Sequence, residues 1–264
     1  MTPFGPQLRQ WRRRRRMSQQ ALSEAAEVST RHISCLENGR SAPSRQMVLL
    51  LASALDVPLR ERNDLLAAAG FTPAYGAHDL SEPEMAPIRH ALDFLFQRFE
   101  PNPALAVDRR WAIQGMNQGA ARLAAWFLAD ATLPPGVMGN AMHLVFHPDG
   151  LRRFVVNWPE VAGVTLARLR RDAARDPDGA GQLLDELLAW PGVPEPAMTG
   201  GDGVLVPIHL RRRGVELRLA TLLTTLGTPV DATAQELTVE LYFPLDAATA
   251  AWLDQGLEGV AQRG

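Results

Sequence analysis

Apolar residues recur every three or four positions through most of the first 70 residues. This spacing predicts amphipathic helices that pack on one another. Ser18, Ser29 and Ser44 can each cap a helix start, and Gly39 suits a helix end. We expect five short helices: one that includes Gln7, then helices over 18–26, 29–38, 44–55 and 59–69.

The helical pattern stops at residues 72–87, which hold three prolines and little apolar periodicity. Such a stretch is typical of a linker. One further amphipathic helix is expected over 87–99. The sequence therefore predicts a helical domain at 1–71, a linker at 72–87 and a second domain at 88–264.

The second domain mixes two periodicities. Alternating runs rich in Val, Leu and Thr predict strands, and three- to four-residue spacing predicts helices. We expect a hairpin of strands over 104–108 and 111–116, a loop at 133–139, and three antiparallel strands over 204–210, 215–224 and 237–243. Helices are expected over 118–128, 160–175, 180–190 and 247–255. The fold class is α+β, with an all-α head followed by a domain built on an antiparallel sheet.

Charge divides the chain in the same place. The net charge is −2, yet residues 1–75 hold 11 arginines against 6 acids and residues 76–264 hold 16 against 23. A basic head on an acidic body indicates that the head meets a polyanion. With a single cysteine, Cys35, and no run long enough for a membrane helix, we expect a protein of the reducing cytoplasm without a disulfide.

The strongest motif is MSQQALSEAAEVSTRHISCLENGR, residues 17–40. It resembles the helix-turn-helix of the XRE/Cro–phage-repressor family: S-Q-x-x-L opens the second helix, V-S opens the third and L-E-N-G-R closes it. Two short helices joined by a tight turn let the second enter the DNA major groove. Glu27 stands at the turn, where this family usually has glycine.

The resemblance implies roles position by position. Gln19 matches a phosphate contact, Thr30, Arg31 and Cys35 face base edges, and Arg31 carries the fork that reads guanine. Residues that pass the DNA backbone would position the head; these are Asn38, Arg40, Ser44 and Arg45. The run Arg12–Arg16 surrounds the first helix, so one or two of its members would contact phosphates while the others are solvated or pair with acids.

The rest of the chain is similar to the MmyB-like regulators, which join an XRE head to a PAS-like ligand-binding domain. The resemblance lies in PLRERNDLLAAAGF (58–71), NPALAVDRRW (102–111), Asn117, Asn157-Trp158, TTLGTPVD (224–231) and YFP (242–244). Asn157 stands where many relatives have Asp. What the resemblance implies is a small, mainly apolar ligand that is fatty-acid-like.

Candidate ligand residues are of two kinds. Large apolar side chains that could line a cavity are Trp111, Met116, Phe146 and Trp158, although the same spacing suits plain core. An acid headgroup would need a cation or a hydroxyl, for which Arg153, His143 and Thr225 are candidates. We expect a cavity of about 300–1,000 Å³, the usual size of a ligand site.

We therefore expect a cytoplasmic homodimer that binds operator DNA and acts as a ligand-controlled repressor. Two alternatives stay open: a second domain that only dimerises, and an enzyme tethered to DNA. No catalytic motif stands out, and His143 with His147 lacks the further ligands of a metal site. We expect neither a cofactor nor a resident metal.

Overall fold

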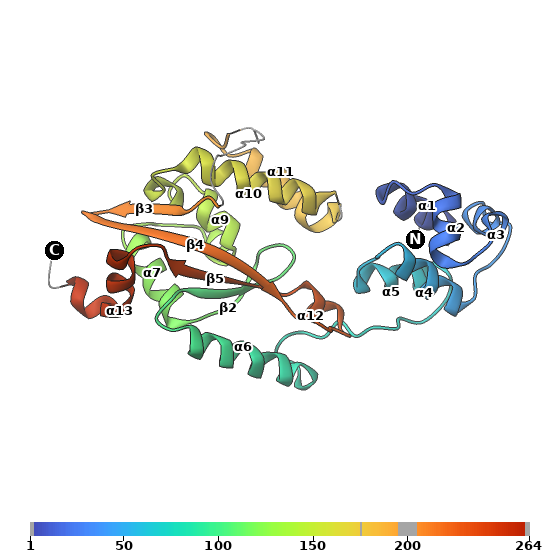
Figure 1. Cartoon of the computed structure of the whole chain (residues 1–264), viewed down its shortest axis with the longest axis horizontal. Coiled ribbons are helices and arrows are strands. Elements are labelled where there is room, and N and C mark those ends of the chain that lie inside the picture. The colour runs from blue at the N-terminus through green and yellow to red at the C-terminus, as the bar shows by residue number, and fades with distance from the viewer. Residues whose placement is uncertain (1–2, 175, 195–204, 262–264) are drawn as a thin grey trace. The chain divides into compact units, whose positions relative to one another are not determined.

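The computed structural model describes residues 3–174, 176–194 and 205–261. The chain divides into two compact units (Figure 1). The first contains residues up to 85 together with 226–236, and the second contains 86–225 and 237–264. The sequence analysis assigned residues 226–236 to the second domain and set 72–87 apart as a linker, so the structural units are drawn differently.

The first unit begins with five helices, as expected from the sequence. They are α1 (Phe4–Arg14), α2 (Gln19–Ala26), α3 (Thr30–Glu37), α4 (Arg45–Ala54) and α5 (Leu59–Ala68). The three predicted serine caps are confirmed: the hydroxyls of Ser18, Ser29 and Ser44 accept hydrogen bonds from the amides of Ala21, His32 and Met47. Capping of this kind satisfies amides that no helix carbonyl can reach.

The turn between α2 and α3 is left-handed. Glu27 has φ 52° and ψ 38°, the conformation that glycine adopts most easily. The structure therefore keeps the tight helix-turn-helix geometry with a glutamate at the turn. The strain costs roughly 1–2 kcal/mol.

Close packing of α1 on α3 depends on a small residue. A Cβ atom on Gly5 would lie 2.5 Å from the Leu36 carbonyl oxygen and 2.8 Å from that of Glu37. Beneath this contact, Leu8, Leu22, Ile33 and other apolar side chains form one buried core.

A buried carboxylate joins the first three helices. The Glu37 side chain at the end of α3 has no exposed surface. Arg12 Nε and Nη2 of α1 donate to its two oxygens at 2.6 and 2.8 Å, and Gln19 Nε2 of α2 donates at 2.8 Å. Arg9 Nε adds a 3.4 Å contact. Desolvation of a carboxylate is costly, so this carboxylate needs all of these donors.

The donors also set the charge state of Glu37. Burial acts to raise the pKa of the carboxyl, but the hydrogen bonds from Arg12 and Gln19 and the charges of Arg12 and Arg9 outweigh it. The pKa of Glu37 therefore lies below its ordinary value, and the group is ionised at neutral pH.

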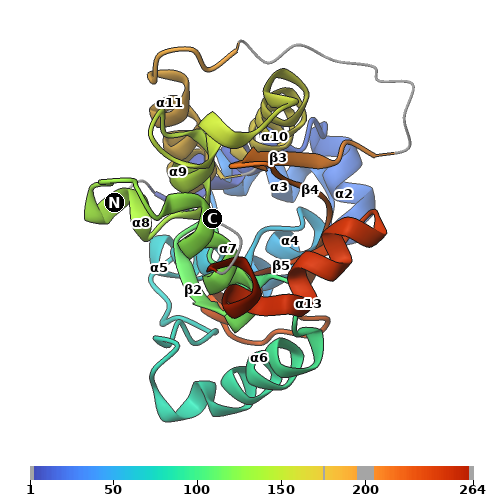
Figure 2. The same cartoon turned by 90° about the vertical axis from the view of Figure 1, so that its left-hand side faces the viewer.

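The second unit is built on one antiparallel sheet of five strands in the order β2-β1-β5-β4-β3. The strands are β1 (Ala104–Val107), β2 (Ile113–Met116), β3 (Ile208–Arg212), β4 (Val215–Thr225) and β5 (Thr238–Pro244). Both views show α10 (Trp158–Ala173) and α11 (Gln182–Leu188) on one side of the strands and α6 (Ala86–Phe99) on the other (Figures 1 and 2).

The remaining helices are α7 (Gln118–Leu128), α8 (Pro135–Met138), α9 (Ala141–Phe146), α12 (Ala232–Glu236) and α13 (Ala247–Ala261). Short 3-10 turns cover Pro83–Met85 and Leu151–Phe154, and a π-helical turn covers Pro177–Gly181.

Most of the expected elements of the second unit are present, and four expectations were wrong. The predicted loop at 133–139 contains α8, which starts at Pro135, a favoured first position of a helix. The third strand begins at Ile208, and Val204 of the predicted range lies outside the described residues. No helix was expected at α9 or at α12, because six and five residues are too few for a periodic pattern to show.

We expect Glu37→Gln to lower the free energy of unfolding of the first unit by about 3–5 kcal/mol, because it leaves arginines packed around a neutral group. The full chain holds six tryptophans, so its fluorescence does not isolate Trp11. Hydrogen exchange of the amides of α1, α2 and α3 in the full chain, across a denaturant series, measures the change. Glu24→Gln, at an exposed position of α2, is the matched control and should change stability by less than about 0.5 kcal/mol.

The lowered pKa of Glu37 also predicts an acid-sensitive head. Its contribution is complete above the unfolded-state pKa of about 4.3 and is lost as the pH falls through the lower folded-state value. The wild type should lose stability relative to Glu37→Gln as the pH falls below about 4.3. A constant difference between the two proteins across that range would contradict the prediction.

Candidate DNA-binding face and ligand cavity

The exposed side of α3 carries the residues expected to read DNA. Thr30 and Arg31 are exposed and Cys35 is half-buried, whereas Ile33 and Leu36 on the opposite side are buried in the core. The hydrophobic pattern therefore leaves one side of α3 exposed, where it could enter a DNA groove. Arg31 is the second residue of α3 on this side.

Several of the expected backbone contacts have structural partners as well. Gln19 donates to Glu37, and the Asn38 side chain accepts from Arg9 Nη2 at 2.6 Å. Ser44 caps α4, and Arg45 Nη1 donates to the Thr72 carbonyl at 2.7 Å. Arg40 is exposed just after α3. The contacts of all these residues with DNA remain predictions.

The arginine run divides between structural and exposed members. Arg12 is held by Glu37, and Arg15 Nε donates to the Leu55 carbonyl at 2.7 Å. Arg13 and Arg16 are exposed, so they are the members of the run with side chains most open to a phosphate.

Helix α12 packs against α5, although it follows β4 far along the chain. Pro58 precedes α5 and offers no side-chain cap. Gln235 Oε1 of α12 accepts the Leu59 amide instead, at 2.7 Å. Arg60 Nε and Nη2 make a two-pronged ion pair with Glu236 at 2.7 and 2.9 Å. We call residues 226–236 the α12 segment.

A second contact ties the α12 segment to residues 76–78. Asp231 Oδ2 lies 2.8 Å from His78 Nδ1 and accepts the His78 amide at 3.2 Å, and the Ala232 amide donates to the Gly76 carbonyl at 2.8 Å. The hydrogen bond with Asp231 raises the pKa of His78. A Cβ atom on Gly76 would lie 2.5 Å from the His78 ring, so this approach requires glycine.

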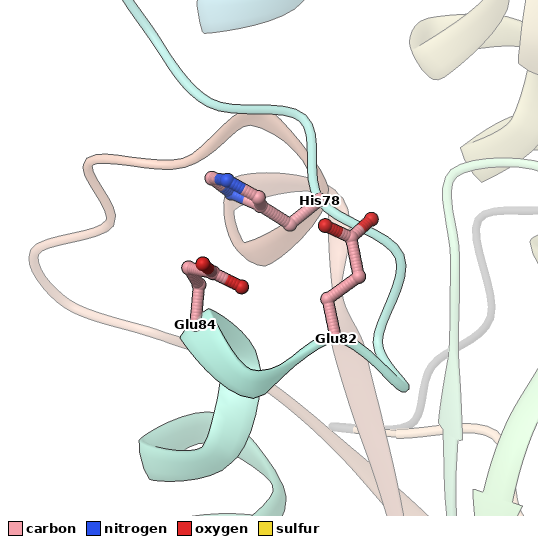
Figure 3. A group of neighbouring side chains, drawn as sticks. All are labelled: His78, Glu82 and Glu84. Atoms are coloured by element: carbon pink, nitrogen blue, oxygen red, sulfur yellow. The ribbon is translucent and has the colours of Figure 1, made fainter.

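His78 also lies close to two carboxylates. Potential ligand atoms of His78, Glu82 and Glu84 lie within 4.8 Å of one another (Figure 3). Both glutamates are exposed, and exposed acids gather in this way without a metal. We assign no metal to the group.

A cavity of about 100 Å³ lies within the second unit. All five strands contribute to its wall, together with α7, α9 and α10. Its lining is almost entirely aliphatic and includes Leu105, Ala124, Leu144, Val161, Leu210 and Leu219. The cavity is smaller than the sequence analysis expected, because branched side chains from both sides of the wall fill much of the space.

The candidate ligand residues fall mostly outside this wall. Met116 lines the cavity. Trp111 and Phe146 are buried in the neighbouring core, which Trp158 flanks. The other three candidates lie elsewhere on the second unit: His143 beside Glu186, Arg153 exposed over Phe154, and Thr225 exposed at the end of β4.

Tyr242 is the only residue of the described lining with a hydroxyl, amide or charged side chain. Its hydroxyl donates to Glu240 Oε2 at 2.5 Å, and Glu240 Oε1 lies 3.9 Å from Arg168 Nη2. Sequence reasoning did not identify this group. Glu240 and Tyr242 are two residues apart on a predicted strand, so they lie on the same face of the sheet. Two polar side chains on a face that packs against the core could have indicated this group.

Comparison with known protein families gives two matches along the chain. Residues 88–255 match the MmyB-like transcription regulator ligand binding domain, and residues 3–65 match a helix-turn-helix domain. The chain belongs to the MmyB-like transcription regulators. It is a transcription regulator with a DNA-binding helix-turn-helix and a ligand-binding domain.

One curated relative is an uncharacterized HTH-type transcriptional regulator, RghRB, from Bacillus subtilis (strain 168), with 40% identity over 76 residues. The match takes in 28% of this chain and 52% of RghRB, so the chain spans about half the length of that relative. A solved structure titled as an RNA-binding Light-Oxygen-Voltage receptor aligns over 96% of this chain and 61% of its own, at 11% identity. Its TM-score of 0.27 is too low to indicate a shared fold. Among the described residues, no helix is both long and apolar enough to cross a bilayer.

We expect Arg31→Ala to weaken operator binding by about 1–3 kcal/mol and to relax preference at one base position, because a guanidinium fork pairs with guanine O6 and N7. Binding to a set of operators that differ at single positions, measured at fixed salt, separates these effects. Arg213→Ala, at an exposed arginine of the second unit, is the control and should leave affinity unchanged. Unaltered affinity and base preference in Arg31→Ala would show that α3 does not read bases through this residue.

Proposed function

We propose that this regulator is a cytoplasmic repressor whose affinity for operator DNA is set by a small apolar, fatty-acid-like molecule bound in the second unit. The first unit would bind DNA through α3, with Gln19, Thr30, Arg31, Cys35, Asn38, Arg40, Ser44 and Arg45 at the DNA. A homodimer would place two such helices about 34 Å apart, one turn of the duplex. The second unit then has a sensing role.

The observation that carries this proposal is the path of the chain between the cavity and the head. Leu219 of β4 and Tyr242 of β5 both line the cavity. The segment that joins these two strands is the α12 segment, which belongs to the first unit and caps α5. A ligand that displaces β4 or β5 therefore acts on strands that continue directly into part of the DNA-binding unit.

The volume of the cavity limits the size of a ligand that can bind without movement of the lining side chains. An apolar cavity of about 150 Å³ can admit a molecule the size of benzene. At about 100 Å³, this cavity holds a short apolar segment without change. A longer acyl chain would have to displace lining side chains, and this displacement would supply the movement that regulation needs. A ligand shifts a conformational equilibrium only if it binds one state better than the other.

A series of straight-chain carboxylates from butanoate to dodecanoate tests the proposal on the delipidated full chain. A ligand that binds only the folded state stabilises it by about 2.7 kcal/mol at 100 times Kd, so the melting temperature should rise. Operator affinity should change by about 5–150-fold with the best ligand. Absence of any melting shift across the series would refute the apolar-ligand proposal.

We expect Ala124→Leu to abolish that melting shift while the protein stays folded. Ala124 lies on α7 and lines the cavity, so a larger side chain there occupies the ligand's space. Leucine also suits a helix interior. Ala125→Leu, at the adjacent exposed position, is the matched control and should leave the shift intact.

We expect Arg60→Ala to uncouple the two functions, because it removes the two-pronged contact with Glu236. The ligand should still raise the melting temperature, but its effect on operator affinity should fall toward none. Arg62→Ala is the matched control, since Arg62 is on the same helix and donates to the Val57 carbonyl. Full ligand control of operator affinity in Arg60→Ala would show that coupling does not pass through this contact.

A further inference from the structure

The cavity has one polar end. Tyr242 lines the cavity with its ring, and its hydroxyl reaches out to Glu240. Glu240 is a buried carboxyl, with 4% of its side chain exposed. Its cross-strand partner on β1 is Leu105, which also lines the cavity. The cavity wall and the carboxyl are therefore continuous.

Arg168 of α10 lies beside Glu240, outside the residues that line the cavity, with 26% of its side chain exposed and with unused hydrogen-bonding capacity. Its Nη2 is 3.9 Å from Glu240 Oε1, which is longer than a hydrogen bond. Its Nε is buried and has no hydrogen-bond partner among the described residues. A buried donor without an acceptor is costly, so this guanidinium is arranged as if for an acceptor supplied from elsewhere.

Trp111 holds the guanidinium in place. The Arg168 Cζ atom lies 4.5 Å from the centre of the Trp111 ring. Trp111 itself has φ 64°, a left-handed conformation that strains a bulky residue. Such strain costs roughly 1–3 kcal/mol and persists where the surroundings enforce it.

Few charged groups face Glu240. Among the described residues they are Arg168 from α10 and Tyr242 from the same strand, and its cross-strand partners on β1 and β4 are Leu105 and Leu223. Burial raises the pKa of Glu240, against the opposing effects of the Tyr242 hydroxyl and the Arg168 charge.

We propose that Arg168 binds the carboxylate headgroup of the ligand, and that the ligand and Glu240 then share a single proton. This inference rests on the proposed function and specifies the headgroup chemistry of the same cavity. Arg168 Nε and Nη2 present the two-pronged geometry that a carboxylate accepts. Two carboxylates this close are not both ionised beside one cation, so one proton stays between them.

Octanoate and its methyl ester test the headgroup on the full chain. The two share an acyl chain, and only octanoate offers Arg168 a charged acceptor. We expect octanoate to bind about 10–100-fold more tightly than the ester, the usual range for a hydrogen-bonded charge. Arg168→Met should remove this preference, and Arg171→Met, at an exposed position of the same helix, should retain it. Equal binding of the two probes by the wild type would overturn the inference.

A pH series of octanoate binding tests the shared proton. We expect the octanoate affinity of the wild type to fall as the pH rises, because loss of the proton leaves two carboxylates beside one cation. Glu240→Gln should bind octanoate without that pH dependence. The same pH dependence in the wild type and in Glu240→Gln would overturn the shared proton.

The outcomes separate the two proposals. If octanoate and its ester bind equally, the headgroup inference fails while the apolar-ligand proposal stands. If neither probe nor any carboxylate of the chain-length series binds, the proposed function fails and the inference falls with it.

Discussion

The first unit depends on one buried carboxylate, Glu37. Burial of this charged side chain costs the free energy of its hydration. Hydrogen bonds donated by residues of α1 and α2 offset that cost. Arg12 and Gln19 are therefore fixed in position, and with them the packing of α1 and α2 against α3. The direction in which α3 presents Thr30 and Arg31 follows from this arrangement. A residue at the end of the recognition helix thus organises the unit without facing DNA.

A few side-chain contacts also hold the α12 segment against α5. A helix that starts after proline lacks a side-chain cap, and its first amides need acceptors from elsewhere. Gln235 supplies one, while Glu236 pairs with Arg60. The α12 segment joins two strands of the cavity wall and also forms part of the first unit. The polypeptide chain itself therefore connects the cavity to the head. This connection is short, because α12 lies directly between β4 and β5.

The cavity combines an aliphatic wall with a single polar end. The wall binds by exclusion of water and has little means of distinguishing one apolar molecule from another. We therefore expect selectivity to depend on Tyr242, Glu240 and Arg168, where an unmade hydrogen bond is costly. Because the charged groups lie beyond the wall itself, the proposed site would recognise the chain length and the headgroup of a ligand with different residues.

The amino-acid sequence by itself determined the five helices that begin the head and the residues that cap them. Helix caps, periodicity and the L-E-N-G-R motif are local, so Ser18, Ser29, Ser44 and the exposed position of Arg31 could be predicted from neighbouring residues. The strands of the second unit were also predictable, because alternation needs only a few consecutive positions. Tertiary structure decided what depends on distant partners. Glu37 meets Arg12 across 25 positions, Leu59 meets Gln235 across 176, and Arg168 meets Glu240 from a separate helix. No local pattern records such pairings, since side-chain hydrogen bonds require only that the fold bring two groups together.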